Sequence, residues 1–97
     1  MYLQTSVINK YCELVNKVKT QNLSEKEVIF KINMDLDLGK RVYTFNNGDY
    51  LIQYFDLVFK VSGFRVVSLY RDRYNKKIHV SESDKKEYLA EIERECA

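Results

Sequence analysis

The fold depends on one stretch of the sequence, which reads Tyr50-Leu-Ile-Gln-Tyr-Phe-Asp-Leu-Val-Phe-Lys-Val61. Nine of its twelve residues are apolar or aromatic, and the three polar ones are Gln53, Asp56 and Lys60. Their spacings of three and four residues would place them on one narrow side of an α-helix. Asp49 suits an N-cap and Gly63 a left-handed C-cap. The sequence therefore favours a buried helix over residues 50–61.

A β-meander is the alternative for this segment. The preceding Asn46-Asn-Gly-Asp49 is a strong signal for a tight hairpin turn, and Ser62-Gly63 offers another. On this interpretation the segment is extended, and Tyr50, Tyr54 and Phe59 could lie on an open sheet face as a binding site. The helix is preferred because the polar residues do not share one parity, as a strand of period two would require.

The segments before this stretch predict a helix and a hairpin. Apolar residues recur at helical spacing over residues 5–20. Over residues 27–36, apolar residues occupy every even position from Val28 to Leu36, and the odd positions between them are mostly polar. This alternation is typical of a half-buried strand. Ser24-Glu-Lys-Glu27 matches a capping box, but this signal is discounted because no helical run follows it. A turn over 37–40 and a returning strand over 41–45 complete the hairpin.

The remaining segments predict a second hairpin and a last helix. They comprise a strand over 64–73, a turn over 74–77, a short strand over 78–80 and a helix that Ser81 or Ser83 caps and that ends near Glu95. The expected fold is an α+β domain over residues 1–97, in the order α-ββ-α-ββ-α, with a four-stranded antiparallel sheet and helices on one face. The alternative is an antiparallel β-meander flanked by N- and C-terminal helices.

Composition indicates a globular protein. The chain has 97 residues, of which 45% are hydrophobic and 31% charged, and this range excludes wholesale disorder. The sequence shows neither a secretory signal nor an apolar run long enough to span a bilayer. Cys12 and Cys96 do not form a CxxC pair, so they predict free thiols in a reducing compartment. We expect a cytoplasmic protein without a membrane partner.

Catalytic and metal-binding constellations are nearly absent from the sequence. His79 is the one histidine, and no nucleophile or orienting acid stands beside it. Asp35 and Asp37 would share a strand face, but a calcium loop needs further acidic ligands, and Lys40 and Arg41 follow instead. The three isolated glycines cannot form a phosphate-binding loop. We therefore expect no enzymatic activity, no cofactor and no metal.

The best candidate for a binding site is the predicted hairpin at 70–79. Six cations between residues 60 and 79 stand against one carboxylate, whereas the last helix carries more acids than bases. Cations and stackable rings suit phosphates and bases, and tyrosine and arginine are also enriched in protein interfaces. The candidate residues for binding a protein or a nucleic acid are Arg65, Tyr70, Arg71, Arg73, Tyr74, Lys76, Lys77 and His79.

These features favour a small non-enzymatic protein that binds and modulates or inhibits a protein partner. Small size, the absence of proline and tryptophan, and abundant lysine and tyrosine resemble phage-encoded inhibitors of host machinery or defence. The alternative is a nucleic-acid-binding protein that uses the 70–79 hairpin, although the net charge of +2 is modest for that role. The sequence leaves open whether the chain forms a homodimer.

Overall fold

The computed structural model describes residues 2–15, 23–72 and 81–96, with side chains described as far as residue 91. Its strands are β1 (Tyr2–Leu3), β2 (Lys40–Thr44), β3 (Tyr50–Tyr54), β4 (Leu57–Ser62) and β5 (Arg65–Arg71). They form one five-stranded sheet in the order β1-β5-β4-β3-β2. Strand β1 pairs in parallel with β5, and every other neighbouring pair is antiparallel. The sheet is therefore an antiparallel meander with one short parallel strand at its edge.

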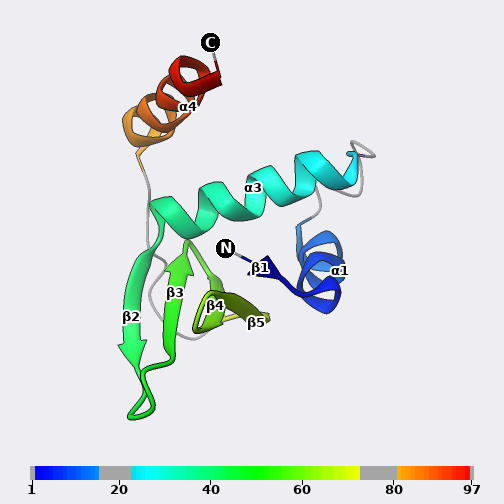
Figure 1. Cartoon of the computed structure of the whole chain (residues 1–97), viewed down its shortest axis with the longest axis vertical. Helices are drawn as coiled ribbons and strands as arrows, with labels where there is room; N and C mark the ends of the chain where they lie inside the picture. The colour runs from blue at the N-terminus through cyan, green and yellow to red at the C-terminus, as the bar shows by residue number, and fades with distance from the viewer. Residues whose placement is uncertain (1, 16–22, 73–80, 97) are drawn as a thin grey trace.

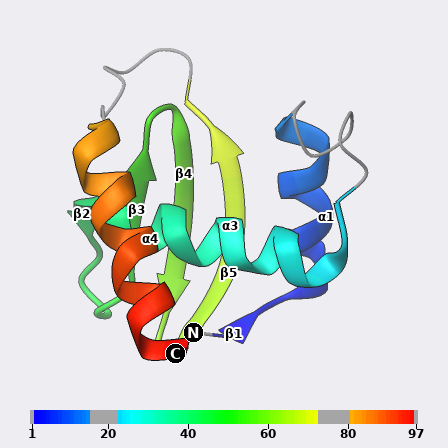
Figure 2. The same ribbon diagram turned by 90° about the horizontal axis from the view of Figure 1, so that it is seen from above.

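The described helices are α1 (Thr5–Leu14), α3 (Glu25–Leu38) and α4 (Glu82–Cys96). Helix α3 crosses over one face of the sheet, and α1 packs beside it against β5 (Figure 1). Helix α4 lies next to the C-terminal half of α3, near the β2 edge (Figure 2). The helices thus gather on one side of the sheet.

The general α+β class is confirmed, but the four-stranded antiparallel sheet is wrong. The fifth strand arises because the Tyr2 backbone N–H donates to the Phe64 carbonyl at 2.8 Å, which aligns β1 along β5. A strand of two residues is too short to produce a period in the sequence. This strand also fixes the start of α1 beside the sheet.

The predicted helix over 50–61 is wrong, and the meander alternative holds here. Residues 50–54 and 57–62 form strands β3 and β4, and Tyr54 pairs with Leu57 across a two-residue turn. The turn contains Asp56, which therefore belongs to neither strand. Gln53 and Lys60 then lie on the same sheet face despite their different parity, because the turn reverses the chain between them. The helix-like spacing of the polar residues was a consequence of this turn.

The predicted strand over 27–36 is also wrong, because this segment lies within α3. The discounted capping signal is real: the Ser24 hydroxyl accepts from the Glu27 N–H at 3.3 Å and donates to the Glu27 carboxylate at 3.2 Å. Val28, Ile32 and Leu36 then recur every four residues and are all buried. The same segment therefore contained apolar residues at helical spacing as well as the alternation.

The other described elements confirm the sequence predictions. Helix α1 lies within the predicted 5–20, although residues 16–22 are outside the described part. Strands β2 and β5 match the predicted strands 41–45 and 64–73 to within two residues at each end. Helix α4 follows Ser81, whose hydroxyl accepts from the Asp84 N–H at 3.1 Å. The predicted turn over 74–77 and strand over 78–80 lie outside the described residues.

The core lies between the sheet and the first two described helices. Phe59, Val61 and Val66 from the sheet are each 0% exposed and pack in one cluster with Val7 of α1 and Ile32 of α3. The connection from α3 to β2 is unusually close, since a Cβ on Gly39 would lie 2.8 Å from the Asp35 and Gln53 carbonyl oxygens. Glycine is required there because the helix end and β3 leave no room for a side chain.

Candidate interaction surface

The two faces of the sheet differ in what covers them. Ile52, Tyr54, Phe59 and Leu69 point to the helix side and are at most 9% exposed. Alternate residues point to the other face, which no helix of the described residues covers (Figure 1). We call this second side the open face, and it is formed by Lys40, Val42, Tyr43, Leu51, Gln53, Val58, Lys60, Ser68 and Tyr70.

A shallow depression of about 330 Å³ lies on the open face. Its rim consists of Val42, Tyr43 and Tyr70, which are 44%, 56% and 43% exposed. Its floor contains Val58 and Gln53, which are 2% and 5% exposed although they face away from the helices. The depression therefore combines apolar and aromatic side chains with the polar side chains of Gln53 and Asp72.

The turn and bulge next to the depression set the position of its aromatic rim. Asn47 accepts from the Asp49 N–H at 3.1 Å, and Gly48 takes a φ of 94° that glycine adopts without strain. The pairing of β2 with β3 shifts between Arg41 and Tyr43, which marks a β-bulge. Bulges turn side chains at sheet edges, and this one brings Val42 and Tyr43 together at the depression.

Cations accompany the apolar surface. Lys40 pairs with Gln53 and Lys60 pairs with Leu51, so both lysines lie on the open face. The Lys60 ammonium lies 4.9 Å from the centre of the Phe45 ring, close enough for a cation–π contact. One carboxylate, that of Asp72, lines the depression among the described residues. The surroundings of the depression therefore favour a negatively charged partner.

The predicted site residues are distributed over different parts of the structure. Tyr70 lies on the open face, as described above. Arg71 points to the opposite side, where its Nη2 donates to the Leu14 carbonyl at 2.7 Å and its Nε lies 3.3 Å from the Asp56 carboxylate. Arg65 lies at the other end of β5, with its guanidinium 5.4 Å from the centre of the Tyr2 ring. Tyr70 is thus the described candidate that lines the depression.

The other predicted site residues lie outside the described part of the chain: Arg73, Tyr74, Lys76, Lys77 and His79. The sequence analysis also missed most residues of the depression. Alternate residues of 41–45 and 50–54 share a sheet face, and this alternation could have indicated the depression. The bulge in β2 interrupts it, and the prediction of a helix over 50–61 removed it from consideration. The three aromatic residues expected on an open face if 50–61 were strand, namely Tyr50, Tyr54 and Phe59, instead point toward the helices.

A buried polar pair lies on the other side of the sheet. Asp35 on α3 is 3% exposed, and the Tyr11 hydroxyl on α1 donates to its Oδ2 at 3.0 Å. Burial raises the pKa of Asp35 to about 7, although the Tyr11 hydrogen bond and the nearby Lys31 and Lys85 oppose this rise. Burial beside the same carboxyl also raises the pKa of Tyr11. Asp35 therefore changes charge near neutral pH.

Helix α4 approaches the same region through two side chains. The Lys85 ammonium lies 5.8 Å from the centre of the Tyr54 ring and 5.2 Å from that of Phe55. Its hydrogen bond with Tyr54 raises the pKa of Lys85, which keeps this side chain charged. The Tyr88 hydroxyl donates to the Asp37 carboxylate at 2.9 Å. The two aspartates considered as metal ligands thus have different partners, and both lie on α3 rather than on a strand.

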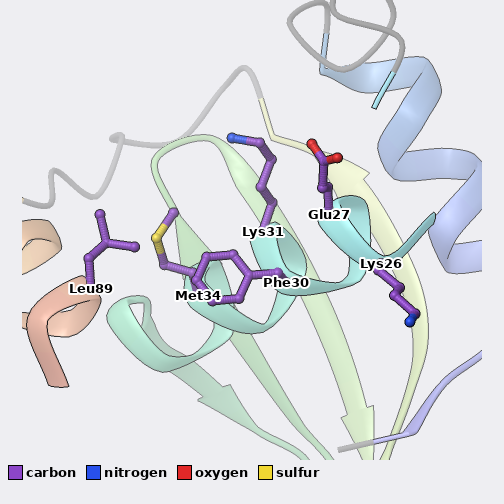
Figure 3. A pocket seen from close by; sticks show the side chains of 6 residues that line it. All are labelled: Lys26, Glu27, Phe30, Lys31, Met34 and Leu89. Carbon is purple, nitrogen blue, oxygen red and sulfur yellow. The ribbon is translucent and has the colours of Figure 1, made fainter. Parts of the chain in front are cut away.

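Another hollow, of about 380 Å³, separates α3 from α4. Figure 3 shows Phe30 and Met34 of α3 on one side and Leu89 of α4 on the other. Phe30 and Leu89 remain 37% and 42% exposed, so the two helices do not close the space between them. Over the side chains described, as far as residue 91, the packing of α4 against α3 is therefore incomplete.

The described residues contain no group of three histidine, cysteine or acidic side chains that could hold a metal ion. None of the described helices is long and apolar enough to cross a membrane. Comparison with protein-family models, with curated proteins and with solved structures finds no match to this chain. Its function must therefore be argued from its own surfaces.

Proposed function

We propose that this protein acts by binding another protein through the open face of its sheet, and that it modulates or inhibits that partner without catalysis. The observation that carries the proposal is the depression bounded by Val42, Tyr43 and Tyr70. Exposed apolar surface of this kind is unfavourable in water and commonly marks an interaction site. Here it lies on the side of the sheet opposite the described helices.

The residue types support a protein partner. Tyrosine side chains supply large contact areas with little loss of conformational entropy, and they are enriched among interface hot spots. Tyr43 and Tyr70 flank a floor whose Val58 side chain is already buried, at 2% exposure. The Gln53 amide at the same floor donates to the Phe55 carbonyl at 2.7 Å, so this amide group is satisfied before binding. A partner can therefore bind without leaving that group unpaired.

The face is a better candidate than the neighbouring sheet edge. Strand β2 is exposed along its whole length, but it carries Lys40, Arg41 and a bulge. Cationic side chains and bulges are the features that discourage strand addition at an edge. Lys40 and Lys60, which lie on the open face, favour an acidic protein surface beside the depression.

The proposal is tested by affinity capture from a lysate of the source organism with three forms of the protein. The first is the wild type, and the second carries Tyr43→Ser and Tyr70→Ser. The third carries Phe64→Ser, a matched control, because Phe64 is 89% exposed on the turn between β4 and β5. We expect one acidic protein to be enriched by the wild type and the control, and to be reduced at least tenfold by the double variant.

Two outcomes contradict the proposal. Equal recovery of every protein by the wild type and the double variant would show that the open face is not the binding surface. Loss of the captured material after nuclease treatment would instead indicate the nucleic-acid alternative, in which Tyr70 stacks on bases. That alternative also predicts binding that weakens steeply with added salt.

A further inference from the structure

A pocket of about 240 Å³ lies where α1, α3, α4 and the turn between β3 and β4 meet. We call it the Asp35 pocket. Its polar and aromatic lining comprises Tyr11, Lys31, Asp35, Tyr54, Phe55 and Lys85. Val15, Met34 and Leu57 add apolar walls. The pocket lies on the helix side of the sheet and is separate from the open face.

The acidic group of the pocket is the Asp35 carboxyl. Its residue is 97% buried, and Tyr11 donates a hydrogen bond to Oδ2. A buried carboxyl is stabilised by hydrogen-bond donors and by positive charge, and Asp35 lines a space that can hold them. The group most complementary to this wall is therefore a cation that carries N–H donors or a diffuse positive charge.

Two aromatic rings provide a second feature that favours a cation. The rings of Tyr54 and Phe55 meet edge to face, with their centres 4.7 Å apart and their planes at 79°. Phe55 has a φ of 54°, which is a strained conformation for a bulky residue in a two-residue turn. Glycine would satisfy the backbone of this turn better, so the phenyl ring points to a role beyond the turn itself.

The chain already places an ammonium group against these rings. The Lys85 Nζ lies 5.2 Å from the centre of the Phe55 ring and 5.8 Å from that of Tyr54, both within the range of cation–π attraction. We propose that the Asp35 pocket recognises an alkylammonium group, and that Lys85 is an internal occupant that must be displaced for an external one to bind.

The attachment of α4 is consistent with displacement. Of the described residues of α4, Lys85 is the one that lines the pocket, and its side chain is 26% exposed. Its ammonium lies 3.7 Å from Glu82 one turn earlier, so this carboxylate can remain beside it when α4 moves away. The hollow between Phe30 and Leu89 shows that the adjoining contact of α4 with α3 is incomplete (Figure 3). Movement of α4 would therefore open the pocket while α1, α3 and the sheet remain packed.

The test compares Lys85→Ala with the wild type and with Lys86→Ala. Lys86 is the exposed neighbour of Lys85 on α4, which makes it a matched control for the loss of a lysine. Two probes distinguish the source of the cation: pentylammonium as a free amine, and a short peptide that contains one lysine. NMR chemical-shift titration of the Tyr54 and Phe55 ring signals reports binding directly. We expect Lys85→Ala to bind at least one probe ten times more tightly than the wild type and Lys86→Ala.

The chemistry of the site is tested in the Lys85→Ala background. Adding Asp35→Asn should weaken binding at least tenfold because it removes the negative charge. Adding Phe55→Gly should weaken binding several-fold because it removes a ring while leaving the turn in a conformation that glycine adopts readily. Lys85→Gln keeps the length of the side chain and provides a second unblocked form if Lys85→Ala alters the circular dichroism spectrum of the protein.

The result also assigns the source of the ammonium group. Binding of the peptide alone would indicate a lysine side chain of another protein, and binding of pentylammonium alone would indicate a free amine. The proposal is overturned if neither probe binds Lys85→Ala and Lys85→Gln. It is equally overturned if the wild type binds as tightly as these variants, or if Asp35→Asn leaves the affinity unchanged.

Discussion

The two faces of the sheet are built from the same strands but differ in what they contribute. On the helix side, Phe59 and Val61 are 0% exposed within a continuous apolar cluster. On the open face, Tyr43 and Tyr70 retain about half of their exposure, and they stand beside lysines. Successive residues of one strand therefore differ: the side chains that face the helices stabilise the fold, and the side chains between them lie on the open face. This comparison can be tested with single substitutions.

The largest expected effect belongs to the centre of the covered face. Phe59→Ala should lower the free energy of unfolding by about 3–5 kcal/mol, because it leaves a cavity where the ring was fully buried. Urea denaturation followed by circular dichroism measures this loss. A loss below about 1 kcal/mol would mean that the helix side is not the main core.

The second effect is a dependence of stability on pH that originates on the covered face. The pKa of Asp35 is raised from 3.8 to about 7 by burial, so the folded state holds this proton more strongly than the unfolded state does. The resulting stabilisation is complete below pH 3.8 and is lost as the pH rises through 7, with a total of about 4 kcal/mol at 1.36 kcal/mol per unit.

Asp35→Asn isolates this contribution. The variant should lack most of the decline in unfolding free energy that the wild type shows between pH 5 and pH 8. Thermal or urea unfolding over this range provides the measurement, and Asp37→Asn is the control because Asp37 is exposed on the same helix. Parallel pH profiles for the wild type and Asp35→Asn would contradict the assignment.

A smaller effect is expected where α3 approaches the sheet. Gly39→Ala should destabilise the protein by about 1–3 kcal/mol, because the new methyl group would lie 2.8 Å from Ile52 Cγ2 and from two carbonyl oxygens. Gly48→Ala is a useful comparison, since a Cβ there meets no atom within 4 Å and the strain comes from the φ of 94° alone. An unchanged urea midpoint for Gly39→Ala would mean that α3 can move away from β3.

The smallest effect on stability should come from the open face. Tyr43→Ser and Tyr70→Ser should each lower the free energy of unfolding by about 1 kcal/mol or less, since about half of each side chain is exposed. The two substitutions together should nevertheless reduce partner capture at least tenfold. A loss of stability comparable to that of Phe59→Ala would indicate that the open face is covered within the protein itself.

The sequence predicted the class of the fold better than its details. Strands β2 and β5 and helix α4 could be found because turn residues, alternation and a serine cap agree locally. The segment 50–61 was misassigned because its turn contains Phe55 and Asp56, a pair without the glycine or asparagine that usually marks a tight hairpin. Without this turn, the sequence does not indicate which side chains of β3 and β4 share a face of the sheet.

Helix α3 was misassigned in the opposite direction, because a helix was predicted to be a strand. Its local cap was visible at Ser24, but apolar residues on several sides of the helix mimicked alternation. Tertiary contact with the sheet selects the face that contains Val28, Ile32 and Leu36. The open face could not be derived from the sequence because it depends on which parity the helices cover. The Asp35 pocket could not be derived either, since its residues come from four separate elements.

Site-specific photo-crosslinking tests the central claim most directly. A photo-reactive residue is placed at Val42, on the rim of the depression, and in a second form at Phe64, on the turn away from it. After irradiation in a lysate of the source organism, we predict one discrete protein adduct from position 42, suppressed by excess unlabelled wild type but not by the Tyr43→Ser, Tyr70→Ser double variant. The same adduct from both positions, or no protein adduct from position 42, would contradict the account.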